Sequence, residues 1–272
     1  MGNAAQLVYK TVTSVEDFVR ETKQIASLAD VLWFRGIPKE SHRLVPSLFR
    51  GALGKTEAEL RQLEEHLNRR FRDRSMPHSL QGRDETSDVT ELQSWWRLFT
   101  MQHYGTPTRL LDWSENALLA LCFAVFSASA APDEDAIVWV LDPCKWNNLG
   151  NANHQRPLSV DEHGAGPYAP LPSSNQHVHA AWPLAIFGMH NSPRIITQQG
   201  TFVIFAPAKP VPMEEHATTK GAPGVEALRA IKLDKSHINS IAKDLRRLGF
   251  AHSSLYPDLH GLSLDLKKEF GY

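Results

Sequence analysis

The chain has 272 residues, of which 42% are hydrophobic and 22% are charged. This composition supports a folded core and excludes a disordered chain, while the length allows one large domain or two small ones. The 29 Lys and Arg residues against 30 Asp and Glu residues give a formal net charge of -1. Only a local patch can therefore attract a nucleic acid or a membrane surface.

The longest mainly apolar run, residues 117–131, carries no charge. It is shorter than the roughly 20 residues that span a membrane, so it predicts a buried helix. Residues 1–10 lack the basic start and the sustained apolar stretch of a secretory signal. We expect a cytoplasmic protein with no membrane partner, in which Cys122 is a small core residue rather than a nucleophile.

The first part of the chain alternates helix and strand. Helical spacing of apolar residues predicts a helix over 15–29, and the run 31–34 reads as a strand that a turn at 35–38 ends. Residues 57–72 form the clearest helix, because apolar side chains share one face while acids come early and arginines late. Residues 88–103 show helical spacing again.

The middle of the chain contains its most apolar elements. A polar, turn-rich segment, 102–109, leads into the apolar helix 116–129, with Ser114 or Asp112 as a candidate N-cap. Residues 136–141 are rich in β-branched side chains and predict a buried strand.

The last part begins with the stretch 147–174, the least regular of the chain, which reads as a long functional loop or an insertion. Strands and then helices follow it, at 195–197, 201–205, 230–233, 238–248 and 261–270. A hairpin at Gly200 joins the first two of these strands. The order of elements is mixed α+β, and we predict a mostly antiparallel sheet core flanked by helices.

The common signatures of phosphate-binding loops, zinc sites and serine hydrolases are missing from the sequence, and no metal site is predicted. Polar residues in apolar surroundings are more informative. Arg35 follows an apolar strand, and a desolvated guanidinium needs an anionic or aromatic partner. Gly36 beside it would let a ligand approach the backbone closely. The pattern fits a ligand-binding role for Arg35 and a structural salt bridge equally well.

Two further polar clusters leave alternatives open. Thr108 and Arg109 can offer a hydroxyl and a guanidinium fork to phosphate or ribose, and Asp112 can pair with Arg109 or cap the next helix. Gln198 and Gln199 read either as part of a hairpin turn or as amides that recognise a ligand.

Together these clusters resemble the FRG domain family, whose name describes the motif seen here as Phe34-Arg35-Gly36. The resemblance covers most of the chain, and the run Gln102 to Trp113 is its most specific part. It also includes the segments 44–50, 194–202 and 254–262. It implies one FRG domain over residues 1–272, with a helical insertion at about 55–103 and an irregular loop insertion at about 147–190. The family name describes a motif and not a reaction.

A second, weaker similarity suggests an activity. ADP-ribosyltransferases place an aromatic residue and an Arg or His on a first core strand, a Ser or Thr before a small-residue helix, and a Gln/Glu-rich late strand. Residues 34–36, Thr108 with 116–124, and 198–202 are similar to these parts in the same order. The similarity implies a split sheet and NAD as the substrate. It implies catalytic roles for Arg35, Gln199 and Asp112, and cofactor-binding roles for Phe34, Gly36, Arg50, Tyr104, Thr108, Arg109 and Gln198.

One feature departs from that family. Cleavage of the nicotinamide bond creates an oxocarbenium-like ribose that an acid stabilises, yet residues 198–200 read Gln-Gln-Gly. An acid from elsewhere, such as Asp112, Glu115 or Asp258, would have to supply the charge, or the site only binds a nucleotide.

The primary hypothesis is an NAD-dependent ADP-ribosyltransferase-like enzyme that acts on a macromolecular or nucleotide acceptor, as a toxin or anti-phage defence effector with a regulatory partner. A non-catalytic nucleotide- or nucleic-acid-sensing module is the first alternative. A nuclease or other hydrolase built on Arg35, His103, Arg109 and Asp112 is the second. All depend on the expectation that Arg35 and the amides of Gln198 and Gln199 converge on one cavity.

Overall fold

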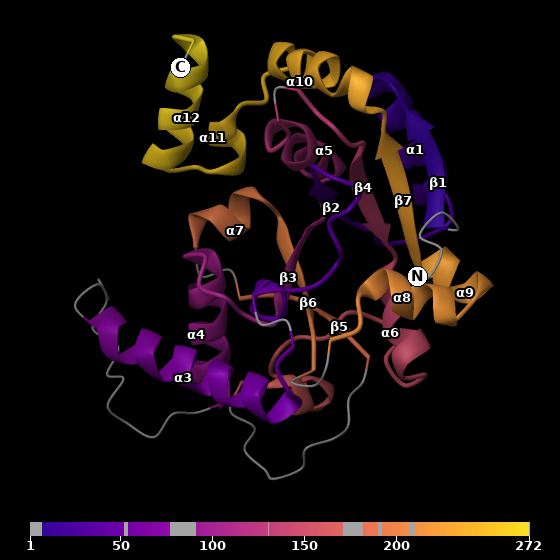
Figure 1. The fold of residues 1–272 in the computed structure, drawn as a ribbon. Helices are drawn as coiled ribbons and strands as arrows, with labels where there is room; N and C mark the ends of the chain where they lie inside the picture. Colours follow the sequence, from indigo (N-terminus) through magenta and orange to yellow (C-terminus); the bar gives the residue numbers. More distant parts are fainter. Residues whose placement is uncertain are drawn as a thin grey trace.

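The computed structural model describes residues 7–51, 54–76, 91–129, 131–170, 182–189, 192–206 and 210–271. Within these ranges the protein has a mixed α/β structure with helices around one seven-stranded sheet (Figure 1). None of the helices found there offers an apolar stretch of the length that a bilayer requires.

The sheet is mostly antiparallel, as predicted. Its strands are β1 (Val8–Val12), β2 (Trp33–Ile37), β3 (Leu110–Ser114), β4 (Ala136–Leu141), β5 (Leu184–Ile186), β6 (Gly200–Ile204) and β7 (Leu228–Leu233). They are arranged in the order β1-β7-β4-β2-β3-β6-β5, and only β1 and β7 run parallel. Two strands, β1 and β5, form the edges and were not predicted.

The hydrogen-bonded pairing of the strands is weak in the middle of the sheet, between β2 and β3. β2 pairs with β4 from Trp33 to Ile37, and β3 pairs with β6 over its whole length. Between β2 and β3, however, the only residues in register are Phe34 and Ser114. All seven strands still belong to one sheet, so the split arrangement of ADP-ribosyltransferases is not confirmed. We call this weakly paired junction of β2 and β3, where Arg35 bonds to Asp112, the opening.

Helices cover both faces of the sheet. On one face, α1 (Val15–Ala26), α5 (Ala117–Phe126) and α10 (Ile238–Arg247) bury one apolar cluster, and α4 (Glu91–His103) buries another against β3 and β6. The helix α3 (Glu57–Ser75) packs outside α4 (Figure 1). The opposite face is covered by α2 (Ser47–Arg50), α6 (Pro143–Gly150), α8 (Met213–Thr219) and α9 (Ala222–Ala227).

Local sequence signals explain most helix starts. The hydroxyl of Thr56 accepts from the N–H of Glu59, whose carboxylate accepts from the N–H of Thr56, so α3 begins with a capping box. The N-cap of α5 is Asn116 and not Asp112, because the Asn116 side chain accepts from two amides of the first turn. Cys122 is a core residue as expected, and burial raises the pKa of its thiol to about 12.

Two local predictions were wrong. Residues 35–37 do not turn the chain but continue β2, because they pair with β4. Residues 195–197 are not a strand but the end of α7 (Pro193–Thr197), since Ser192 caps this helix and Pro193 occupies its first turn. Gly200 therefore joins a helix to β6, and no hairpin forms there.

The irregular stretch is partly ordered. It contains the end of α6, the 3-10 helix η3 (His163–Tyr168) and β5, while residues 171–181 and 190 lie outside the described ranges. The chain ends with η4 (Lys235–His237), α10, α11 (His252–Leu255) and α12 (Leu259–Glu269). Gly249 follows α10 with a positive φ of 92°, which confirms the predicted end of that helix.

Candidate functional site

Arg35 lies on β2 at the opening between β2 and β3. Its Nη1 donates to the backbone oxygen of Asp112 at 2.6 Å, so the guanidinium takes the place of a missing ladder bond. The side chain as a whole is half-buried, but its Nε is fully covered and has no hydrogen-bond partner in the described part of the chain. Among the described residues no carboxylate forms an ion pair with Arg35, which argues against the structural salt bridge.

A second guanidinium, that of Arg50, acts on Arg35 through its charge. Arg50, at the end of α2, donates to the backbone oxygen of Val45. Burial lowers the pKa of Arg35, the charge of Asp112 opposes this, and the charge of Arg50 adds to it. Burial also lowers the pKa of Arg50, against the effect of Asp112. The two arginines are therefore close enough to repel each other and share one nearby acid.

A chain of hydrogen bonds holds the Asp112 carboxylate. The side chain is exposed, and the Nε2 of Gln102 donates to both of its oxygens at 2.9 Å. The Oε1 of Gln102 accepts from the hydroxyl of Thr108, which itself accepts from the N–H of Leu110 at 3.1 Å. Thr108 thus orients Asp112 through Gln102. Sequence reasoning placed Gln102 in the cluster but gave it no role.

The two late glutamines behave differently. Gln198 donates from Nε2 to the backbone oxygen of Leu255 at 2.6 Å, and its own backbone oxygen accepts from the Ser114 hydroxyl at 2.6 Å. Gln199 is exposed and has a φ of 46°, in the left-handed region that disfavours side chains. Since Ser114 pairs with Phe34, both glutamines lie next to the end of β3 that adjoins β2.

Two hollows lined by described residues lie away from Arg35 and the glutamines. One, of about 710 Å³, follows α1, and another, of about 490 Å³, lies beside His154 and Gly164. The convergence of Arg35 and the glutamines on one cavity therefore stays a prediction.

Several of the predicted contact residues are held by packing within the protein; besides Thr108, which is 1% exposed, they are Arg109, Phe34 and Gly36. Arg109 is 1% exposed and binds the Glu64 carboxylate through Nε at 2.7 Å, so a ligand cannot reach it in this structure. Phe34 is buried in the core beneath α5. A Cβ on Gly36 would lie 1.8 Å from the backbone oxygen of Ala120, so this glycine admits α5 rather than a ligand. Each of these residues has a structural role.

Tyr104 is the most accessible of the predicted residues. It is 72% exposed at the end of α4, and its ring meets the ring of His103 edge-on at 4.6 Å. It forms the border of the site on the side of α7 and α11.

Comparison with known proteins supports the sequence-based resemblance. The family model of the FRG domain matches residues 30–133. This segment contains both arginines of the opening, the Gln102–Asp112 pair, β2, β3 and α5. No match was found among curated proteins or among solved structures. The segment that matches the FRG domain model thus contributes Arg35, Arg50, Gln102 and Asp112 to the opening.

Proposed function

We propose that this chain is an NAD-dependent ADP-ribosyltransferase-like enzyme that acts on a macromolecular or nucleotide acceptor. The observation that carries the proposal is the Arg35 guanidinium, which bonds to the backbone oxygen of Asp112 where β2 and β3 separate, with the charges of Arg50 and of the exposed Asp112 carboxylate near it. The similarity to ADP-ribosyltransferases in the order of the motifs supports the choice of NAD.

The two arginines suit a pyrophosphate. Guanidinium groups bind phosphate oxygens with paired donors, and a charged donor that is buried without a partner is costly. The covered Nε of Arg35 has no acceptor among the described residues. The negative charge of a pyrophosphate beside these guanidiniums would relieve the repulsion between Arg35 and Arg50.

Asp112 supplies the acid that residues 198–200 lack. As the bond between nicotinamide and the ribose C1 breaks, the bonding electrons leave with nicotinamide and positive charge develops on the ribose. A fixed carboxylate beside that charge stabilises the transition state. The acceptor nucleophile then bonds to C1 and loses its proton to solvent. Gln102 holds the carboxylate by both oxygens, so it is already oriented before NAD binds.

The direct test is incubation of the purified protein with adenylate-labelled NAD and cell lysate. We expect labelled macromolecules and released nicotinamide. Asp112→Asn should lower turnover by about 100-fold or more, in the range seen for loss of one electrostatic group, and change NAD affinity little. Arg35→Lys should weaken NAD binding, because lysine cannot reproduce the guanidinium fork.

Arg247→Lys is the matched control, since Arg247 forms an exposed pair with Asp244 on α10, outside the site. Equal effects of Arg35→Lys and Arg247→Lys on NAD binding would contradict the proposal. Nicotinamide release without labelling would instead identify a glycohydrolase.

A non-catalytic nucleotide-sensing module is the second candidate. It is favoured by the missing acid at residues 198–200 and by the bond from the Gln198 amide to Leu255, which removes that amide from a ligand. Saturable NAD binding with no loss of nicotinamide, in the wild type and in Asp112→Asn alike, would support this candidate.

A further inference from the structure

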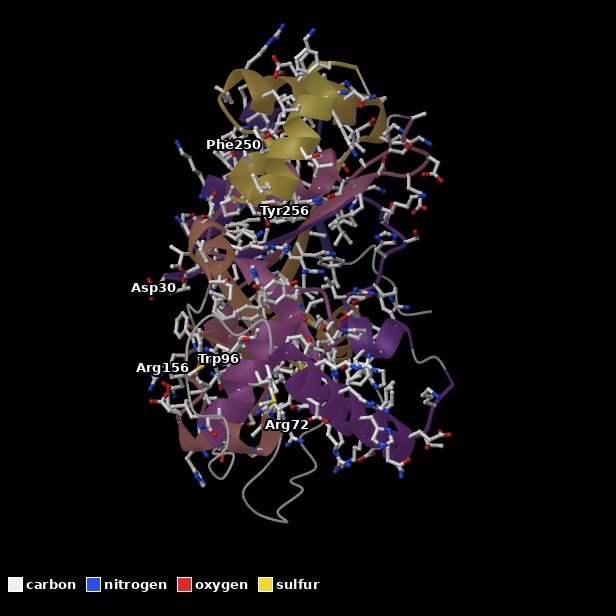
Figure 2. All side chains as sticks on the ribbon, turned by 90° about the vertical axis from the view of Figure 1, so that its left-hand side faces the viewer. Asp30, Arg72, Trp96, Arg156, Phe250 and Tyr256 are labelled. Carbon is white, nitrogen blue, oxygen red and sulfur yellow. The ribbon has the colours of Figure 1, made fainter. Side chains whose placement is uncertain are left out.

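Three segments that are far apart in sequence meet at one surface beside the opening. They are His103 and Tyr104 at the end of α4, Arg194 on α7, and Tyr256 with His260 at the junction of α11 and α12. We call these five residues the aromatic platform. Figure 2 shows Tyr256 at the lower edge of the C-terminal helices, above α4, the helix that carries Trp96.

Arg194 lies at the centre of the platform. Its guanidinium carbon lies 4.7 Å from the centre of the Tyr256 ring, and its Nη1 is 3.5 Å from the backbone oxygen of His103. The ring of His260 meets the Tyr256 ring edge-on at 5.8 Å. Within the described ranges Arg194 forms no ion pair with a carboxylate. Its guanidinium therefore lies over the half-buried ring of Tyr256, which Phe123 also contacts at 6.0 Å, with no carboxylate bonded to it.

His103 and Tyr104 form the other side of the platform. Gly105, with a φ of 75°, turns the chain directly after Tyr104, so this ring projects from the end of α4. Burial, together with the nearby charge of Arg194, lowers the pKa of His103, and the charge of Asp258 opposes this. The Ser192 hydroxyl lies 3.3 Å from the His103 Nδ1 and holds this ring in place.

The platform adjoins the opening through two elements. Gln102, which binds Asp112, immediately precedes His103 on α4. Gln198 bonds to Leu255, the neighbour of Tyr256, and to Ser114 at the end of β3. A chain bound to the platform would thus have one end beside the proposed ribose position.

We infer that the aromatic platform binds the unpaired bases of a single-stranded nucleic acid, which is then the acceptor class of the site proposed above. That the bound nucleic acid is the acceptor of the reaction rests on the proposed function, whereas its binding to the platform does not. Aromatic rings and arginine planes stack on every base without sequence preference, and each stacked base contributes substantially to affinity. Bases in a duplex are already stacked, so a single strand is preferred.

The phosphate backbone adds a second recognition element. Arg194 at the platform and Arg35 and Arg50 at the opening have no carboxylate bonded to them in the described part, although the charges of Asp258 and Asp112 lie near them. These guanidiniums supply local positive charge on a chain whose formal net charge is -1. Binding should therefore depend on salt, with each phosphate contact contributing a slope of about 0.7 for a single strand.

The test is fluorescence anisotropy of a labelled single-stranded RNA of about 12 nucleotides, a length within the range that one such surface covers. The same sequence as single-stranded DNA and as a duplex is measured in parallel. Tyr104→Ala and Arg194→Gln should each weaken single-strand binding by about tenfold, while Tyr104→Phe, which keeps the ring, should retain it. Arg194→Gln should also reduce the salt slope by about 0.7.

The matched controls are Tyr9→Ala and Arg229→Gln. These two residues form another arginine–tyrosine pair, at 5.7 Å, on the β1–β7 edge at the far end of the sheet order. Tyr9 is 38% exposed. Both control variants should bind the single strand like the wild type. Thermal melting confirms that every variant is folded.

Three results would overturn the inference: no binding of the single strand, equal binding of the duplex, or equal losses in the control variants. Equal loss of NAD affinity in Tyr104→Ala and Arg194→Gln would also overturn it, because the platform would then hold the base of the dinucleotide. Labelling of proteins by NAD without RNA binding would contradict the inference but leave the proposed function intact. RNA binding through the platform without NAD turnover would support the inference and contradict the proposed function.

Discussion

Arg35 and Gly36 are neighbours on β2, but the sheet directs them to opposite faces. Arg35 shares its face with Trp33 and Ile37, while Gly36 lies beneath α5. The motif that names the family thus combines a charged group at the opening with a glycine that lets the helix approach the strand. The two residues are adjacent for different physical reasons.

Gly36→Ala tests the packing role of this glycine. The new Cβ would overlap the backbone of Ala120, so α5 would have to move, and we expect a loss of about 3 kcal/mol in the free energy of unfolding. The measurement is urea denaturation followed by circular dichroism. Gly51→Ala is the control, because its Cβ would lie 3.7 Å from the nearest atom and its φ is -81°. The control should be neutral or stabilising by up to about 1 kcal/mol; similar losses in both variants would contradict this account.

At the scale of elements, a buried ion pair connects α3 to the sheet. Arg109 on the chain entering β3 binds Glu64 of α3, and its other nitrogens donate to the backbone oxygens of Phe205 and Tyr168. The residue therefore links α3, the end of β6 and η3. The phosphate contact predicted for Arg109 from its position before the strand is replaced by this link, since the guanidinium is enclosed.

Glu64→Gln should lower the free energy of unfolding by about 3 kcal/mol, because it leaves a buried guanidinium without a counter-charge. Chemical denaturation measures the change. The neighbouring Glu65 forms an exposed pair with Arg69 on the same helix, so Glu65→Gln should cost at most about 0.5 kcal/mol. If both substitutions destabilise the protein equally, the link through Glu64 is not what stabilises α3.

On the scale of the whole molecule, the sheet consists of two well-paired parts with a weak junction. Phe205 donates to the backbone oxygen of Arg109 at 3.1 Å, and continuing that register places the amides of Leu111 and Trp113 toward β6. The backbone groups of Asp112 then point toward β2, and the Arg35 guanidinium donates to the Asp112 backbone oxygen. The opening is thus a property of the strand order and not of one side chain.

Amide hydrogen exchange can detect this junction. We expect the amide of Asp112 to exchange at least about 100-fold faster than the amides of Leu111 and Trp113, because local opening costs far less than global unfolding where a ladder is interrupted. Exchange followed by two-dimensional NMR resolves the three residues. Equal protection of all three would mean that β2 and β3 are fully paired in solution.

Much of the local structure could be predicted because its causes lie within a few residues. Apolar spacing identified α1, α3, α5 and α10, and β-branched runs identified β4 and β7. The strand predicted at residues 195–197 failed although the correct signal was present. Ser192 and Pro193 form a helix start, and this short-range signal outweighed the β propensity of the two isoleucines.

The sequence by itself determined the mixed α+β composition, the six longest helices, and the FRG motif with Asp112 as a candidate acid. Only the tertiary structure decided which polar residues meet. Arg35 bonds to Asp112 and Arg109 bonds to Glu64, at sequence separations of 77 and 45 residues. Apolar periodicity and caps act along a single helix or strand, whereas the partner of a buried charge depends on how the elements pack. Nothing in the local sequence distinguishes an arginine at an opening from an arginine in the core.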